Sequence, residues 1–185
     1  MSIRSAALVI SPSRAEAITA AKELAPLLYS AGFSLYTISD VSLEGIKKVA
    51  PSDLPEIEVA VVLGGDGTIL RAAEITLTRN IPLLGINLGH VGFLAESERA
   101  DLADTVRAVE NRDYLVKERL TLDVEVVRAG ESVFKSWALN ESTVERAAAG
   151  RMLEVVIEVD KRPLSSFGCD GIVLSTPTGS TAHAF

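Results

Sequence analysis

The first half of the chain alternates short apolar runs with longer segments of helical spacing. The apolar runs, typical of strands buried on both faces of a parallel sheet, lie at Ala6–Ile10, Val59–Leu63 and Leu83–Ile86, and Phe33–Ile38 is expected to be a further strand. The helical segments lie at Ala15–Ala31, at about Thr68–Leu77 and at Arg99–Asn111. Strands that alternate with helices form right-handed βαβ units, which predicts an open doubly wound sheet over roughly the first 110 residues.

Local signals predict the ends of these elements. Ser11-Pro12-Ser13 is expected to start the first helix, with serine as the N-cap and proline in the first turn. Pro26 is expected to kink that helix and Gly32 to stop it. We assign one short helix to Ser42–Pro55, and a turn to Asn80-Ile81-Pro82.

From Leu120 the pattern changes to alternation of apolar and polar residues. Leu120 to Val126 alternate, Gly130 turns the chain, and Val133–Val144 and Leu153–Val159 alternate again, which predicts antiparallel strands. The fold class is therefore α/β: an open doubly wound sheet in residues 1–113, followed by a mainly antiparallel β domain in residues 114–185.

Net charge and cysteine content indicate which partners and which cell compartment to expect. The net charge is −7 with no basic run, which argues against nucleic acid and against an anionic membrane surface. Cys169 is the only cysteine, so no intrachain disulfide forms and a reducing cytoplasm is expected. No segment approaches the ~20 apolar residues of a membrane span. The sequence predicts a soluble cytoplasmic chain.

The stretch Glu58–Leu70 carries the clearest chemistry, because a buried strand runs directly into Gly64 and Gly65 and then into a helix. Glycine lets backbone N–H groups approach an anion, and the start of a helix adds unpaired N–H groups, so this is a phosphate site. Asp66 has two interpretations that the string alone leaves open. Its carboxylate either holds a cation or accepts a proton, or it caps the helix that begins near Gly67.

Further loops also follow strands. Asn87–Phe93 lies beyond the next strand, at the edge where such sheets bind ligands. There His90 is either a base or a structural residue, and Phe93 either stacks on a base or fills the core. In the second half, the loop Ser175–His183 is rich in hydroxyls. It is either a ligand site, which we favour, or a hairpin turn.

Taken together, these strings resemble the signatures of the NAD kinase family. They are Gly64-Gly65-Asp66-Gly67-Thr68, Asn140-Glu141, and Asp170-Gly171 followed by Ser-Thr-Pro-Thr-Gly-Ser-Thr-Ala. The glycine string alone is shared with diacylglycerol, sphingosine and phosphofructokinase relatives, whereas the combination is more specific. The resemblance implies transfer of the terminal phosphoryl group of ATP, or of polyphosphate, to the 2′-hydroxyl of the adenosine ribose of NAD.

The resemblance also implies roles for individual residues. Asp66 is the general base, while Gly64, Gly65 and Gly67 bring backbone donors to the phosphates. Asn140 and Glu141 hold the adenosine part and help to place a divalent cation, expected to be Mg²⁺. Asp170 accepts a hydrogen bond from the nicotinamide side of NAD. The other binding positions that the resemblance implies are Thr68, Arg71, Phe93, Arg151, Thr178, Thr181, Ala182 and His183.

The sequence departs from the family pattern at two places. His183 stands where the family usually has tyrosine, and the chain stops at Phe185, directly after the loop. The resemblance implies further strands there, so we expect a truncated β domain with exposed edges and apolar faces, hence poor solubility or a need for partner chains. A homo-oligomer, dimer or tetramer, is expected by resemblance. The alternatives are a non-catalytic nucleotide-binding fragment, and a lipid or sugar kinase that shares the glycine loop.

Overall fold

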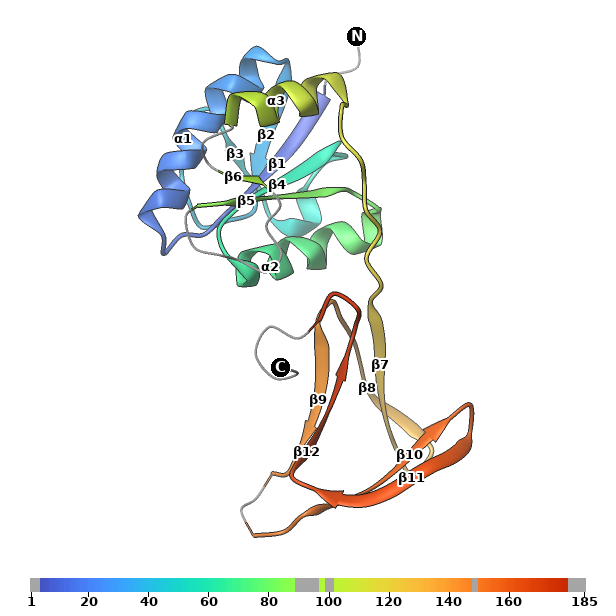
Figure 1. The fold of residues 1–185 in the computed structure, drawn as a ribbon. Coiled ribbons are helices and arrows are strands. Elements are labelled where there is room, and N and C mark those ends of the chain that lie inside the picture. Colours follow the sequence, from blue (N-terminus) through green and yellow to red (C-terminus); the bar gives the residue numbers. More distant parts are fainter. Residues whose placement is uncertain (1–3, 89–96, 99–101, 148–149, 180–185) are drawn as a thin grey trace. The chain divides into compact units, whose positions relative to one another are not determined.

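The chain consists of two compact units, Met1–Val116 (unit 1) and Lys117–Phe185 (unit 2). The computed structural model describes residues 4–88, 97–98, 102–147 and 150–179. Figure 1 shows the helices gathered in unit 1, whereas unit 2 consists of strands. Because each unit has its own architecture, we describe each one by itself.

Unit 1 is built on a parallel sheet. Its strands are β1 (Arg4–Ile10), β2 (Phe33–Thr37), β3 (Lys47–Lys48), β4 (Val59–Leu63), β5 (Leu83–Asn87) and β6 (Ser97–Glu98). Their order is β3-β2-β1-β4-β5-β6, and every neighbouring pair is parallel. This is the doubly wound order, in which the chain reverses direction across the sheet between β1 and β4. The predicted α/β fold class is confirmed.

Helices cover both faces of this sheet. Successive side chains of the central strand β1 point to opposite faces, so each face carries apolar residues that a helix can cover. Leu8 and Ile10 of β1 pack into one core with α1 (Ala15–Ser30) and α3 (Leu102–Asn111). Ala7 and Val9 pack into the other core, which includes residues of α2 (Asp66–Thr76). Figure 1 shows α1 and α3 together on one side of the sheet and α2 on the other. Both faces are therefore buried, as the continuous apolar runs predict.

Two details of unit 1 correct the sequence-based predictions. The N-cap of α1 is Arg14 rather than a serine, and Ser11 instead shares a hydroxyl contact of 3.4 Å with Ser13. The segment Ser42–Pro55 is not a helix: it contains the short strand β3 and a 3₁₀ turn at Pro51–Asp53. Gly45 has a φ of +78°, which a right-handed α-helix does not accommodate, and Pro51 opens the 3₁₀ turn. The helix α1 ends at Ser30, and Gly32, the predicted stop, follows the C-cap Ala31 with a φ of +84°.

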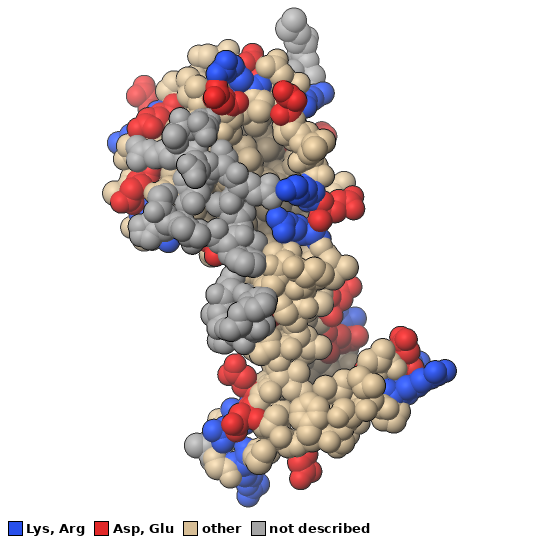
Figure 2. All heavy atoms as spheres, in the orientation of Figure 1, with Lys and Arg blue, Asp and Glu red and all other residues tan. Residues whose placement is uncertain are grey.

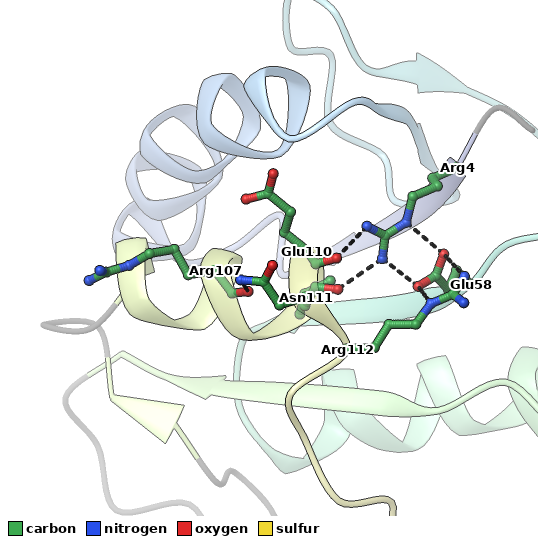
Figure 3. A network of polar contacts seen from close by, with 7 residues as sticks. Arg4, Glu58, Arg107, Glu110, Asn111 and Arg112 are labelled. Atoms are coloured by element: carbon green, nitrogen blue, oxygen red, sulfur yellow. Dashed lines mark hydrogen bonds and ion pairs between the residues drawn. The ribbon is translucent and has the colours of Figure 1, made fainter. Parts of the chain in front are cut away.

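A network of arginine and glutamate ties together three segments of unit 1 (Figure 3). Arg4 of β1 donates to Glu58, just before β4, from Nε at 2.8 Å and from Nη2 at 2.5 Å. Arg4 also donates to the carbonyl oxygens of Val109 and Glu110 in α3, and Arg112 donates to Glu58 at 3.0 Å. The hydrogen bonds from Arg4 and Arg112 lower the pKa of Glu58 to about 2. The end of α3 is thereby fixed to the sheet.

Unit 2 consists of three antiparallel strand pairs. They are β7 (Leu122–Arg128) with β8 (Glu131–Ala138), β9 (Glu141–Glu145) with β12 (Gly171–Ser175), and β10 (Leu153–Val159) with β11 (Arg162–Cys169). Many of its apolar side chains are exposed, among them Phe134, Leu164 and Leu174. In Figure 2 much of the visible surface over these strands is uncharged. In the described part of the chain, no helix is both long and apolar enough to cross a membrane.

Candidate functional site

The glycine loop of unit 1 lies at the carboxyl edge of the parallel sheet. It connects β4 to α2, beside the end of β1, where the Ser11 N–H donates to the Leu63 carbonyl oxygen at 2.9 Å. The buried Ser39 side chain accepts from the Ile10 N–H at 2.8 Å and so fixes the end of β1 to the chain after β2. Ligands of doubly wound sheets bind at this edge, beside the reversal in strand order.

The three glycines of this loop meet different surroundings. A Cβ on Gly64 would lie 2.7 Å from the Thr68 Cβ, so the loop and the first turn of α2 are in close contact there. A Cβ on Gly65 would lie 3.0 Å from Nη2 of Arg14. A Cβ on Gly67 would meet no atom of the described residues within 4 Å. The loop is therefore packed at Gly64 and Gly65 and open at Gly67, on the outer side of the helix.

Asp66 is the first residue of α2, and the N-cap is Gly65. The Gly65 carbonyl oxygen accepts the first helical hydrogen bonds, from the N–H groups of Thr68 at 2.9 Å and Ile69 at 3.1 Å. Of the two interpretations of Asp66, the one in which it caps the helix is therefore wrong. Its carboxylate lies in the first turn, where the positive end of the helix dipole favours negative charge. A carboxylate at an anion-binding loop suits proton transfer or cation binding.

Arg71 lies one turn further along α2 and is exposed. The positive charge of Arg71 interacts electrostatically with Asp40, which follows β2 at the same edge of the sheet. The pKa of Asp40 is lowered mainly by its hydrogen bond with Lys48 at 2.6 Å, and to a smaller extent by Arg71. The edge around the glycine loop thus carries several cationic side chains.

In unit 2 the pairing of β9 with β12 joins two of the predicted strings. Asn140 precedes β9 and Glu141 begins it, opposite Ser175. The Thr176 N–H donates to the Asn140 carbonyl oxygen at 2.8 Å, and the Thr176 hydroxyl donates to that of Leu139 at 2.6 Å. The Asn-Glu string and the hydroxyl-rich loop are therefore brought together at one end of this strand pair.

Buried polar atoms without partners mark this end of unit 2. Asn140 is only 5% exposed, yet its Nδ2 and Oδ1 have no hydrogen-bond partner in the described part of the chain. The same holds for Oε2 of Glu141. Thr176 and Thr178 are buried beside them. Leaving a buried polar group unpaired costs about 1–3 kcal/mol, so these atoms fit a site at which a polar ligand completes the hydrogen bonds.

Two further predicted residues of unit 2 lie elsewhere. Asp170 precedes β12 at the opposite end of the pair from Asn140, six residue steps or roughly 20 Å away along the strand. It is paired with Arg146 at 3.3 Å. Arg151 is exposed and follows Gly150, whose φ is +98°. The structure therefore does not group Asp170 with the Asn-Glu end of the strand pair.

Several predicted residues lie outside the described residues: His90, Phe93, Thr181, Ala182 and His183. Two others were not predicted. Thr176 fastens the hydroxyl-rich loop to the Asn-Glu string, and Arg14 lies against the glycine loop. The position of Arg14 after β1 was the available signal, because the loops after adjacent parallel strands share one edge of the sheet.

Comparison with known proteins gives a consistent picture. Residues 43–114 match the family model described as the ATP-NAD kinase N-terminal domain, and residues 139–185 match that of the ATP-NAD kinase C-terminal domain. NAD kinase 2 of Streptomyces coelicolor is 48% identical over 99% of this chain and 64% of its own length. This chain spans 40% of the length of the NAD kinase of Thermobifida fusca and 65% of that of Mycobacterium bovis.

Solved structures share the fold. The yeast NADH kinase, crystallised with NADH, covers 97% of this chain with a TM-score of 0.84, and the match spans 59% of that enzyme. At 23% identity this likeness concerns the fold. An NAD kinase from Archaeoglobus fulgidus in complex with ATP is 25% identical, with a TM-score of 0.65, over 98% of this chain and 64% of its own.

Proposed function

The chain belongs to the NAD kinase family, and on that premise we propose that it acts in making NADP. The reaction is transfer of the terminal phosphoryl group of ATP, or of inorganic polyphosphate, to the 2′-hydroxyl of the adenosine ribose of NAD. One observation carries the proposal. The loop from Gly64 to Thr68 opens a helix at the carboxyl edge of the sheet, with a carboxylate in its first turn and open space at Gly67.

In the proposed phosphoryl transfer, Asp66 acts as the general base. A bond forms between the 2′-oxygen and the terminal phosphorus, while the bond from that phosphorus to the bridging oxygen of the donor breaks. The proton of the 2′-hydroxyl passes to the Asp66 carboxylate, and ADP or the shortened polyphosphate leaves. The N–H groups at the start of α2 and the backbone of Gly64, Gly65 and Gly67 are proposed to face the negative charge of the phosphates.

A divalent cation, expected to be Mg²⁺, neutralises phosphate charge in such transfers. Among the described residues, no three histidine, cysteine or acidic side chains gather into a metal cage. At kinase sites Mg²⁺ is bound by one or two protein carboxylates together with the substrate phosphates. Asn140 and Glu141 are proposed to help place the cation, as the family resemblance implies.

The residues of unit 2 are proposed to bind NAD. The unpaired amide of Asn140 and the carboxylate of Glu141 suit the adenosine part, which offers both donors and acceptors. Asp170, at the other end of the strand pair, is proposed to accept from the nicotinamide side. The remaining binding positions are proposed from the family resemblance: Thr68, Arg71, Phe93, Arg151, Thr178, Thr181, Ala182 and His183.

The decisive measurement is NADP formation from NAD, ATP and Mg²⁺ by the purified chain. We expect turnover in the wild type and at least a hundredfold loss in Asp66→Asn, because general-base catalysis contributes roughly 10²–10⁴-fold. NAD binding should survive in the variant. If neither this chain nor one extended past Phe185 forms NADP, the proposal is wrong. Binding of NAD without turnover in both would instead support a nucleotide-binding module.

The location of the protein in the cell and its oligomeric state stay predictions. A cytoplasmic location rests on the single cysteine, Cys169. A homo-oligomer rests on the family resemblance alone. Sedimentation of the purified chain would measure its oligomeric state.

A further inference from the structure

Arg14 lies against the glycine loop in a way that its role in the fold does not explain. Its backbone carbonyl oxygen starts α1 by accepting from the N–H groups of Ala17 and Ile18. Its exposed side chain instead reaches Gly65, which belongs to a different loop of the same sheet edge. The side chain therefore crosses from the end of β1 to the start of α2.

The distances define how the guanidinium lies. A Cβ added to Gly65 would lie 3.0 and 3.4 Å from the two terminal nitrogens of the Arg14 guanidinium and 3.3 Å from its central carbon. These distances place the outer end of the guanidinium beside the loop. The side chain is exposed, so N–H donors in the plane of the group remain available to a ligand.

Glycine at position 65 leaves room for this contact. Its φ of −96° and ψ of −171° are an extended conformation that any residue adopts. The backbone therefore does not require glycine there. What a side chain at this position would meet is the guanidinium of Arg14. Gly65 thus permits the close approach of a cation to the loop.

Among the described residues of unit 1, four arginines have hydrogen-bond or ion-pair partners, whereas Arg14 and Arg71 have none. Arg4 and Arg112 pair with Glu58, Arg107 pairs with Asp104, and Arg79 donates to the Leu54 carbonyl oxygen at 2.7 Å. For Arg14, no hydrogen bond or ion pair is present within residues 4–88, 97–98, 102–147 and 150–179. An unpaired guanidinium therefore lies beside a loop whose backbone suits an anion.

We propose that Arg14 is a binding residue for the phosphoryl donor, holding a donor phosphate against the Gly64-Gly65 loop. This inference rests on the proposed function and deepens it. The planar guanidinium binds phosphate oxygens through two parallel hydrogen bonds, which a lysine ammonium cannot reproduce. Arg14 would hold and orient the donor and take no proton in the reaction.

The test measures donor binding separately from turnover. ATP and inorganic tripolyphosphate are titrated into the full chain by calorimetry, because both carry the phosphates and only ATP carries adenosine. Arg14→Gln should weaken the binding of both ATP and tripolyphosphate by roughly tenfold or more, since a charge-assisted hydrogen bond is lost. Arg14→Lys should give an intermediate loss of affinity. Arg107→Gln, which removes the same charge from an exposed helix position, is the matched control and should stay within twofold.

A second variant addresses the geometry. Gly65→Ala should displace the guanidinium and weaken donor binding in the same direction. The double variant should lose little more than Arg14→Gln alone, because both changes act through one contact. Circular dichroism and thermal melting show whether each variant is folded. Additive losses would contradict the packing argument.

The outcomes separate this inference from the proposed function. If the wild type forms NADP and Arg14→Gln binds both donors within twofold of it, the inference falls and the function stands. If Arg14→Gln loses donor affinity but no chain forms NADP, the inference stands and the function falls. In an active wild type, Arg14→Gln should raise KM for ATP and leave KM for NAD within twofold. If the wild type binds neither donor, the inference falls as well.

Discussion

At the scale of single residues, two glycines of one loop are constrained differently. Gly64 lies against Thr68, so an added Cβ would lie 2.7 Å from the Thr68 Cβ, an atom fixed close to the backbone. Gly67 lies on α2 with no described atom within 4 Å of its added Cβ. The fold therefore explains the glycine at 64 and leaves the one at 67 without a packing reason, as expected where a ligand approaches the backbone.

Alanine at these two positions should have opposite effects on stability. Gly64→Ala should destabilise unit 1 by about 1–3 kcal/mol, because the added methyl overpacks a close contact. Gly67→Ala should be neutral or stabilising by up to about 1 kcal/mol, since alanine is the better helix former, and yet weaken donor binding. Urea denaturation measures the first effect and calorimetry with ATP the second. A strongly destabilised Gly67→Ala variant would contradict this argument.

At the scale of elements, the network around Glu58 fixes the start of β1 and the end of α3 to the sheet. Glu58→Gln removes the charge while keeping the shape. We expect a loss of about 1.5–3 kcal/mol at pH 7, the value of hydrogen bonds to a charged group. Arg107→Gln, which affects only an exposed pair within α3, is the control and should change stability by less than about 1 kcal/mol.

The same network gives a defined pH dependence. The folded pKa of Glu58 is lowered from 4.5 to about 2, chiefly by the hydrogen bond from Arg4. A depressed pKa means that the stabilisation is complete above the unfolded pKa and is lost as pH falls toward 2. The gap in unfolding free energy between wild type and Glu58→Gln should therefore be constant above about pH 5 and should shrink below pH 4.5. A gap that is unchanged at pH 3 would refute this assignment.

The sequence predicts the elements of unit 1 better than those of unit 2. Continuous apolar runs identify buried parallel strands, and the glycine loop identifies the ligand edge. Alternation also predicts β7 and β10, but β11 and β12 were missed. Arg162–Cys169 contains proline, glycine and several polar residues, so it lacks a clear period. The pairing of β9 with β12 joins residues about thirty positions apart, from Ser175↔Glu141 to Gly171↔Glu145, which no local pattern specifies.

The same limit applies to the candidate site. The string around Asp66 predicts the loop because the chemistry is local. The contact of Arg14 with Gly65 depends on two strands lying side by side. Likewise, the burial of the Asn140 amide depends on the fold, and the sequence predicts only that a polar residue stands there. Local chemistry is therefore visible in the sequence, whereas contacts between loops require the structure.

At the scale of the whole molecule, the two units differ in how they are held together. Among the described residues, every buried hydrophobic side chain belongs to unit 1, from Ala6 to Val109. The buried polar side chains of unit 2 are Asn140, Thr176 and Thr178, and its strands form three separate pairs. A pair of strands alone is marginally stable in water. Unit 1 should therefore fold independently, and unit 2 should not.

Limited proteolysis tests this difference. Residues 113–120 are exposed and lie outside helices and strands, and they include Lys117 and Arg119. Trypsin should cut there first and leave a resistant fragment ending near Lys117, while the remainder is degraded, because cleavage follows the population of open states. Mass spectrometry identifies the fragment, and its thermal melt should remain cooperative. A Lys117→Gln, Arg119→Gln variant should delay the first cut. Survival of unit 2 with loss of unit 1 would show that the core of unit 1 does not determine the resistance of the chain.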